Sequence, residues 1–157
     1  MFSVGMMRNG IIEPNSLQDI WAVAGVGLIR ACVGNDDGTS NLVLQGLARV
    51  RLLDLIQEQP FRIVKIELLH PNRGNLIEAE ALCVKVKELC GQIQKLGVRL
   101  PANLMDQMQQ IDDPEVLADV VAAAFIAEPN SRQQLLEAGG VPDRLRLLIQ
   151  LLRGQIN

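Results

Sequence analysis

The chain has 157 residues, is 48% hydrophobic and carries a formal net charge of −3 at pH 7. This length and apolar content suit one domain or two packed lobes and argue against disorder. The acidic balance and scarce aromatics disfavour nucleic-acid binding, so no nucleic acid is expected as a partner. The apolar runs at 20–29 and 120–127 are too short to span a bilayer, so no membrane association is expected. No secretion signal is recognisable, so the expected location is cytoplasmic.

The first seventy residues are rich in Val, Ile and Leu, in short segments separated by turn residues. Strands are predicted at 3–7, 22–33, 41–53 and 61–69. This spacing predicts a small antiparallel sheet or partial barrel.

The turn between the second and third predicted strands contains Asp37-Gly38, which predicts a hairpin with a primed turn, because Gly accepts a positive φ. Leu42 and Leu44 share one side of the following strand and are expected to face inward. Gly46 interrupts that strand and predicts a bulge or bend.

Helical patterns begin after His70. Asn75 followed by Glu78 is a plausible capping pair for a helix that runs to about Lys95, with Gly97 as its stop. Pro101 is expected to open a second, short helix.

Three further helices are predicted in the remaining sequence. Asp113-Pro114 supplies a cap and a first helical residue for one, and Asn130 or Ser131 caps the next, which ends at Gly139-Gly140. Pro142 starts the last. Strands followed by helices predict an α+β fold with segregated elements.

The sequence contains no recognisable reactive constellation. The single histidine, His70, has no partner to orient it, and the lysines lack the following Ser or Thr of a P-loop. The carboxylate pairs, Asp36-Asp37 and Asp112-Asp113, occur where a turn or a helix cap favours Asp. No catalytic, cofactor-binding or metal-ligating residue is therefore predicted.

The three cysteines, Cys32, Cys83 and Cys90, lack the spacing of a zinc or redox motif. Cys83 and Cys90 are seven residues apart in a helical pattern and are expected to be reduced core thiols on one face. Met105 and Met108 are expected to be core residues, with an adaptable peptide groove as the alternative.

Collinear motifs cover most of the chain. Between 26 and 69 stand Asp37-Gly38, Gly46-Leu47-Ala48-Arg49 and Pro60-Phe61. Between 100 and 152 stand Asp113-Pro114, Leu117-Ala118-Asp119, Gln133 to Glu137, and Arg144-Leu145. In this order they resemble the N-terminal, substrate-recognition domain of the ATP-dependent Lon protease family.

This resemblance implies a PUA-like antiparallel β lobe, incomplete at its N-terminus, at 1–73, followed by an α-helical lobe at 74–157, together forming one domain. It implies recognition of unfolded or tagged polypeptides. The chain contains no ATPase module and no Ser-Lys peptidase of the family, so a non-enzymatic role without cofactors is expected.

A β lobe that is incomplete at its N-terminus should expose an apolar strand edge. Phe2, Met6 and Met7 are the predicted partner-binding residues, which would pair with a bound polypeptide or form a homodimer by strand addition. The alternative is that this strand is covered within the monomer. At the level of function, the alternatives are a structural or oligomerisation protein and an RNA-binding PUA-like module, although the acidic pI and few aromatics count against the latter.

Overall fold

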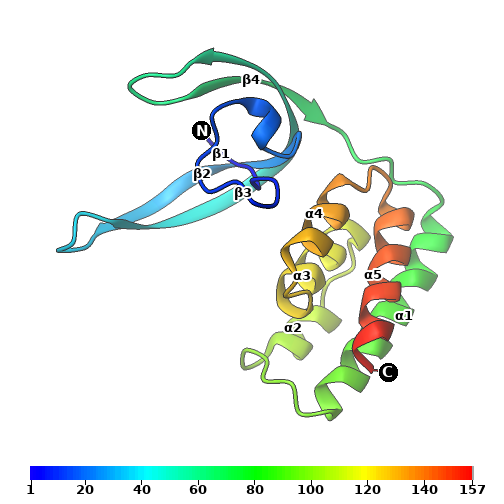
Figure 1. The fold of residues 1–157 in the computed structure, drawn as a ribbon. Helices are drawn as coiled ribbons and strands as arrows, with labels where there is room; N and C mark the ends of the chain where they lie inside the picture. The colour runs from blue at the N-terminus through cyan, green and yellow to red at the C-terminus, as the bar shows by residue number, and fades with distance from the viewer. Residues whose placement is uncertain (157) are drawn as a thin grey trace. The chain divides into compact units, whose positions relative to one another are not determined.

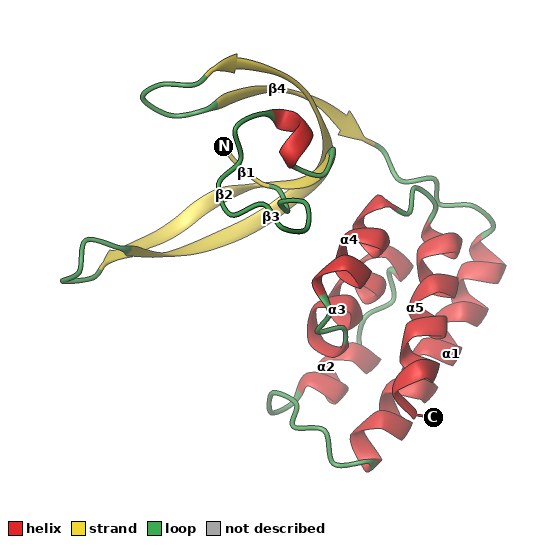
Figure 2. Cartoon of the chain, in the orientation of Figure 1, coloured by secondary structure: helices red, strands yellow, loops and turns green. Residues whose placement is uncertain are grey.

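The structure is a computed structural model that describes residues 1–156 (Figure 1). It consists of two compact units, one from Met1 to His70 and the other from Pro71 onward. The first contains a four-stranded antiparallel sheet and the second contains five α-helices, so the predicted α+β class is confirmed (Figure 2).

The sheet has the order β1-β2-β3-β4, so strands adjacent in sequence are also neighbours in space. Its strands are β1 (Phe2–Val4), β2 (Val23–Gly34), β3 (Ser40–Gln57) and β4 (Ile63–Leu69), and a 3-10 helix, η1 (Leu17–Asp19), precedes β2. The long β3 pairs with β2 through its first part and with β4 from Arg49 onward. All four strands match predicted ones, although β1 ends at Val4.

The core of the sheet is small and lies where the pairing of β2 with β3 overlaps the pairing of β3 with β4. Ala24, Val26 and Val50 are buried there, and Leu52 and Ile66 pack against them. The rest of the long β2–β3 pair extends beyond this core.

The β2–β3 hairpin is confirmed, but its turn is not the predicted primed type. The loop has three residues, since the Asn35 amide donates to the Thr39 carbonyl at 2.8 Å and the Gly38 amide donates to the Asn35 carbonyl at 3.1 Å. Only Gly38, at φ +82°, has a positive φ in this loop. A type I turn followed by a left-handed glycine therefore closes the hairpin.

The β3 strand has the predicted irregularity beside Gly46. Gly27 pairs with Gly46 and Val26 pairs with Ala48, so Leu47 is the extra residue of a bulge. The inward placement of Leu42 and Leu44 is wrong, because these side chains are 41% and 37% exposed. The pairing of β1 with β2 extends only to Gly27 and that of β4 with β3 begins only at Arg49, so this part of the hairpin is two-stranded.

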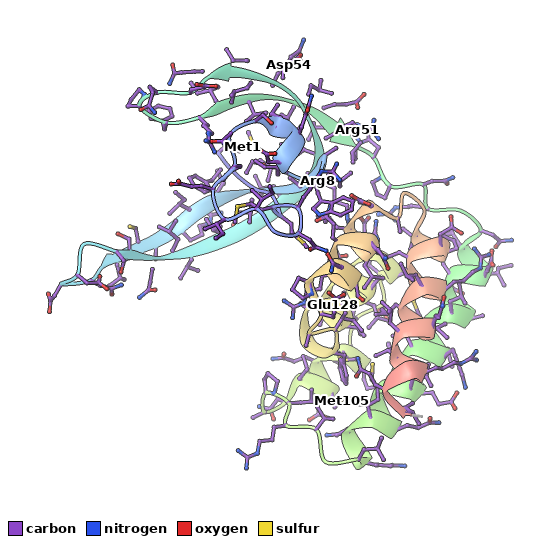
Figure 3. The ribbon with its side chains drawn as sticks, viewed as in Figure 1. Met1, Arg8, Arg51, Asp54, Met105 and Glu128 are labelled. Atoms are coloured by element: carbon purple, nitrogen blue, oxygen red, sulfur yellow. The ribbon has the colours of Figure 1, made fainter. Side chains whose placement is uncertain are left out.

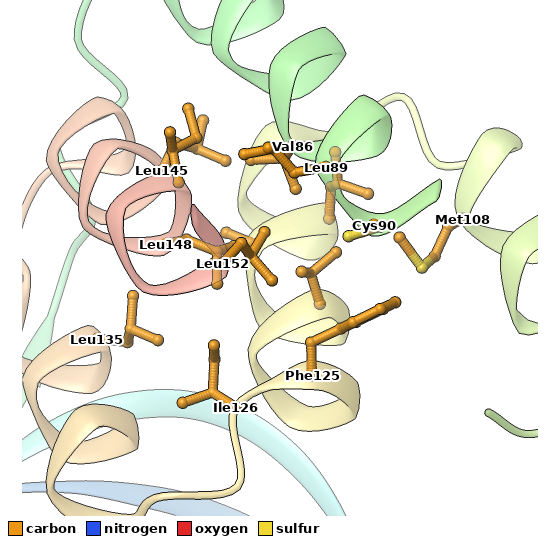
Figure 4. Packing of buried hydrophobic residues seen from close by; sticks show 14 of the residues in the cluster. Val86, Leu89, Cys90, Met108, Phe125, Ile126, Leu135, Leu145, Leu148 and Leu152 are labelled. Carbon is orange, nitrogen blue, oxygen red and sulfur yellow. The ribbon is translucent and has the colours of Figure 1, made fainter. Parts of the chain in front are cut away.

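The second unit contains α1 (Leu76–Lys95), α2 (Leu104–Gln109), α3 (Pro114–Phe125), α4 (Pro129–Glu137) and α5 (Val141–Ile156). Its core is formed by buried side chains from all five helices, including Val86, Met108, Phe125, Leu135 and Leu148 (Figure 4). Met108 is fully buried and Met105 packs against the same core, as the sequence predicts.

The caps of these helices follow the sequence closely, with three differences. Asn75 accepts hydrogen bonds from the amides of Ile77 and Glu78, but the Glu78 side chain bonds Arg146. The second helix begins at Leu104, after a turn at Pro101. The cap of α4 is Glu128, not Asn130 or Ser131, because Pro129 occupies the first helical position.

Candidate functional site

The edge strand β1 presents apolar side chains to solvent. Phe2 and Val4 are 46% and 53% exposed, and they pair with Gly27 and Gly25 of β2. Because both partners are glycines, no cross-strand side chain covers Phe2 or Val4. Gly27 is required by close packing, since a Cβ atom there would lie 2.4 Å from the Gln45 carbonyl oxygen.

The structure places Met6 and Met7 just beyond β1, on a segment that pairs with residues 20 and 21. The Trp21 amide donates to the Met6 carbonyl at 2.9 Å, and Met7 bridges Ile20. Met7 is 40% exposed and Met6 is half-buried. The guanidinium carbon of Arg8 lies 4.6 Å from the centroid of the Trp21 ring, and this contact supports the end of the segment. Arg8 is labelled in Figure 3. Phe2, Met6 and Met7 thus lie on one segment at the sheet edge, and their role in binding stays a prediction.

A larger apolar surface lies on the β2–β3 hairpin. Among the described strands, β1 pairs no further than Gly27 and β4 no further than Arg49. Residues 28–34 of β2 and 40–48 of β3 therefore form a two-stranded segment, here called the ribbon, with open outer edges (Figure 2). Its exposed apolar side chains are Ile29, Val33, Leu42, Val43, Leu44 and Leu47.

The ribbon is not among the surfaces predicted from the sequence. The signal that could have revealed it is the run Leu42-Val43-Leu44, which does not alternate between apolar and polar side chains. A strand with one buried face alternates, whereas this run places apolar groups on both faces.

The tip of the ribbon is acidic and ordered by hydrogen bonds. Asp37 Oδ1 accepts from the Thr39 hydroxyl at 2.6 Å and from the Thr39 amide at 2.9 Å. These bonds, led by the one from the hydroxyl, hold the pKa of Asp37 below its ordinary value. Asp36 lies beside it and is exposed.

The residues that carry the family resemblance in the helical unit have structural roles. Asp113 accepts from the amides of Glu115 and Val116 and caps α3, as predicted. Arg144, which is 1% exposed, lies 3.6 Å from both Glu115 and Asp119 and donates to the Ala138 carbonyl at 3.2 Å. These contacts join α3 to α5 and fix the turn between α4 and α5.

The cysteine side chains match the expectation of free thiols. Cys90 is fully buried, Cys83 is half-buried against the same core, and Cys32 is exposed on the ribbon. Burial raises the pKa of Cys90 to about 12 and also raises that of Cys83. The two helical thiols therefore stay protonated near neutral pH.

The helical unit has a shallow hollow bordered by Arg73, Leu76, Asp113 and Pro114, with a volume of about 10 Å³. This is room for about one water molecule.

Within residues 1–156, no three His, Cys, Asp or Glu side chains are grouped so as to hold a metal ion. In the same range, no helix is long and apolar enough to cross a membrane.

Residues 2–154 match the family described as ATP-dependent protease La (LON) substrate-binding domain. The chain is 31% identical over 153 residues to a Lon protease of Anaeromyxobacter dehalogenans and 29% identical over 153 residues to Lon protease 2 of Myxococcus xanthus. Each alignment covers 97% of this chain and 18% of the relative, so the chain spans about a fifth of their length.

The fold is also similar to a solved structure, the N-terminal domain of the Mycobacterium avium complex Lon protease. The TM-score is 0.71 with 22% sequence identity, over 84% of this chain and 70% of that chain. This likeness shows the fold, and the match of residues 2–154 to the family model shows that the chain belongs to the family of the Lon protease substrate-binding domain.

Proposed function

We propose that this chain is a non-catalytic recognition module for polypeptides, which binds unfolded or tagged chains in an extended conformation. The observation that carries the proposal is the match of residues 2–154 to a substrate-binding domain. That match spans both compact units, which supports a single recognition domain built from the β lobe and the helical lobe.

The edge strand β1 is the proposed binding site. It is the terminal strand of the sheet, and an added strand would bond to its outer backbone groups. Phe2, Val4 and Met7 are exposed beside that edge and would contact apolar side chains of the bound polypeptide. Backbone pairing gives affinity for any extended chain, while these side chains select apolar segments.

Fluorescence anisotropy tests the function. A labelled, permanently unfolded polypeptide is titrated with the chain at physiological salt, and the same polypeptide in a folded form is the control. Saturable binding to the unfolded form alone supports the proposal. Equal binding to both forms, or none, rejects it.

Substitutions test the site. Phe2→Ser and Met7→Ser are each expected to weaken binding by about fivefold or more, because each removes exposed apolar contact area. Ile12→Ser is the matched control, since Ile12 is 91% exposed in the same unit but lies outside the strands. If Ile12→Ser weakens binding as much as Phe2→Ser does, the site is not at β1.

A further inference from the structure

The outer edge of β3 from Ser40 to Gly46 lacks the features that normally protect a sheet edge. These seven residues include no charge and no proline, and their pairing with β2 leaves none of them as the extra residue of a bulge. Leu42 and Val43 are 41% and 60% exposed on its two faces. Such an edge is a template for another strand.

The other edges of the sheet are shorter, charged or interrupted by a bulge. On β2, the extra residue of a bulge is Arg30, whose Nε donates to Gln45 Oε1 at 2.6 Å. The strand β4 has seven residues, and two of them, Lys65 and Glu67, are charged. The strand β1 has only three residues. The β3 edge of the ribbon is therefore the longest regular edge without charge.

Charges flank this edge in a definite order. Asp36 and Asp37 precede it at the tip, Arg49 and Arg51 follow it, and no charged residue lies between Gly38 and Ala48. Arg51 is 51% exposed, although Glu67 at 3.0 Å partly offsets its charge. Electrostatics favours an antiparallel partner strand that, from its N-terminus to its C-terminus, has acidic residues, then an uncharged segment, then basic residues. A second copy of β3 has that order, whereas two parallel copies would bring like charges together.

We propose that two copies of the chain associate through β3, antiparallel along Ser40–Gly46, to form one continuous sheet. This surface is distinct from the polypeptide site proposed at β1. A two-fold axis near Val43 would bring the acidic tip of each copy, at Asp36 and Asp37, to the end of the open edge beside Arg49 of the other copy, where β4 begins to pair with β3. The added strand fills the edge between the hairpin tip and Leu69, where β4 ends beside Arg49.

Sedimentation velocity over a range of concentrations provides the first test. The chain is expected to form a reversible dimer, and Val43→Lys is expected to weaken it by about tenfold or more, because it adds a charge to the seam. Val33→Lys is the matched control, since both valines are 60% exposed on the same ribbon, with Val33 on β2. Circular dichroism verifies that both variants fold.

Charge reversal provides a sharper test at low ionic strength, where screening is weak. Asp36→Lys and Arg51→Glu are each expected to weaken self-association by about threefold. An equimolar mixture is expected to associate more tightly than either variant alone, because the mixed dimer restores an attractive tip-to-base contact.

Three results would overturn the proposal. The first is a monomer at every concentration, and the second is equal weakening by Val33→Lys and Val43→Lys. The third is a mixture of the charge variants no tighter than its components. If the chain is monomeric and Val43→Lys instead abolishes binding of the unfolded polypeptide, the ribbon is a polypeptide-binding surface.

Discussion

Arg144 in α5 and Glu115 in α3 form an ion pair at 3.6 Å, although the Arg144 side chain is only 1% exposed. Asp119, one turn further along α3, lies at the same distance from this guanidinium. The two acids are 22% and 50% exposed, so they keep contact with water while neutralising a buried charge. This arrangement explains why acidic and basic motif residues, far apart in sequence, belong to one structural unit.

Replacing Arg144 by Leu should destabilise the helical unit by about 2 kcal/mol, because the Ala138 carbonyl loses its donor and α3 loses its ion pairs with α5. Arg146→Leu is the control. Arg146 lies on the same helix and pairs with Glu78 and Asp143, but its side chain is 50% exposed, so a loss below about 1 kcal/mol is expected. Urea denaturation measures both, and equal losses would contradict a special role for burial.

Gly27→Ala should destabilise the sheet by about 2 kcal/mol, because its Cβ would clash with the Gln45 backbone. Gly25→Ala, two residues earlier in the same strand, meets no atom within 4 Å and should change stability by less than about 1 kcal/mol. Thermal melting of the two variants separates the cases. A Gly27→Ala variant as stable as the wild type would show that the close pairing of β2 and β3 is absent.

Acid should destabilise the start of α4, which Glu128 caps, and the hairpin turn at Asp37. The pKa of Glu128 lies below its ordinary value of 4.5 because its carboxylate accepts hydrogen bonds from the Asn130 amide and from Ser131. Hydrogen bonds from Thr39 likewise lower the pKa of Asp37. A carboxyl group whose pKa is lower in the folded state than in the unfolded state stabilises the fold at a pH above its unfolded-state pKa. This stabilisation is lost as the pH falls through the folded-state pKa. Carboxyl NMR titration should therefore give a Glu128 midpoint below 4.5. A midpoint at or above that value would contradict the cap.

The cysteines should react with a thiol reagent in a fixed order near pH 8. Cys32 is exposed and should react first, whereas Cys90 is buried with a pKa of about 12 and should react only after unfolding. Mass spectrometry of partly labelled chain gives the order. Early labelling of Cys90 would mean that the helical core opens readily.

Local signals in the sequence were sufficient for most secondary structure. Asn75 and Asp113 are short polar side chains placed before apolar helical patterns, and both cap the helices expected from them. The cap of α4 was misplaced because Glu128 is a less usual cap residue than Asn130 or Ser131. The same local reasoning found the hairpin but not its turn type, since one glycine fits both a primed turn and a type I turn with a bulge.

Long-range burial was harder to predict. Leu42 and Leu44 share a side of β3, which predicts a buried face, but burial requires a second layer of side chains, and both residues are exposed in the structure. Likewise, no local pattern indicates that Arg144 is buried, since this depends on the acids that α3 brings from more than twenty residues away. The apolar character of Phe2, Met6 and Met7 predicts their place at a binding edge, and the structure adds that Met6 is half-buried.

Hydrogen exchange of the chain, with and without a saturating, permanently unfolded polypeptide, tests the proposed recognition most directly. Strand addition predicts slower exchange of amides in Phe2–Val4, because their outward groups become bonded, while the buried helix α5 stays unchanged. Unchanged exchange at β1 would contradict recognition at this edge. Unchanged exchange throughout the chain, at a polypeptide concentration far above that of the protein, would contradict polypeptide recognition itself.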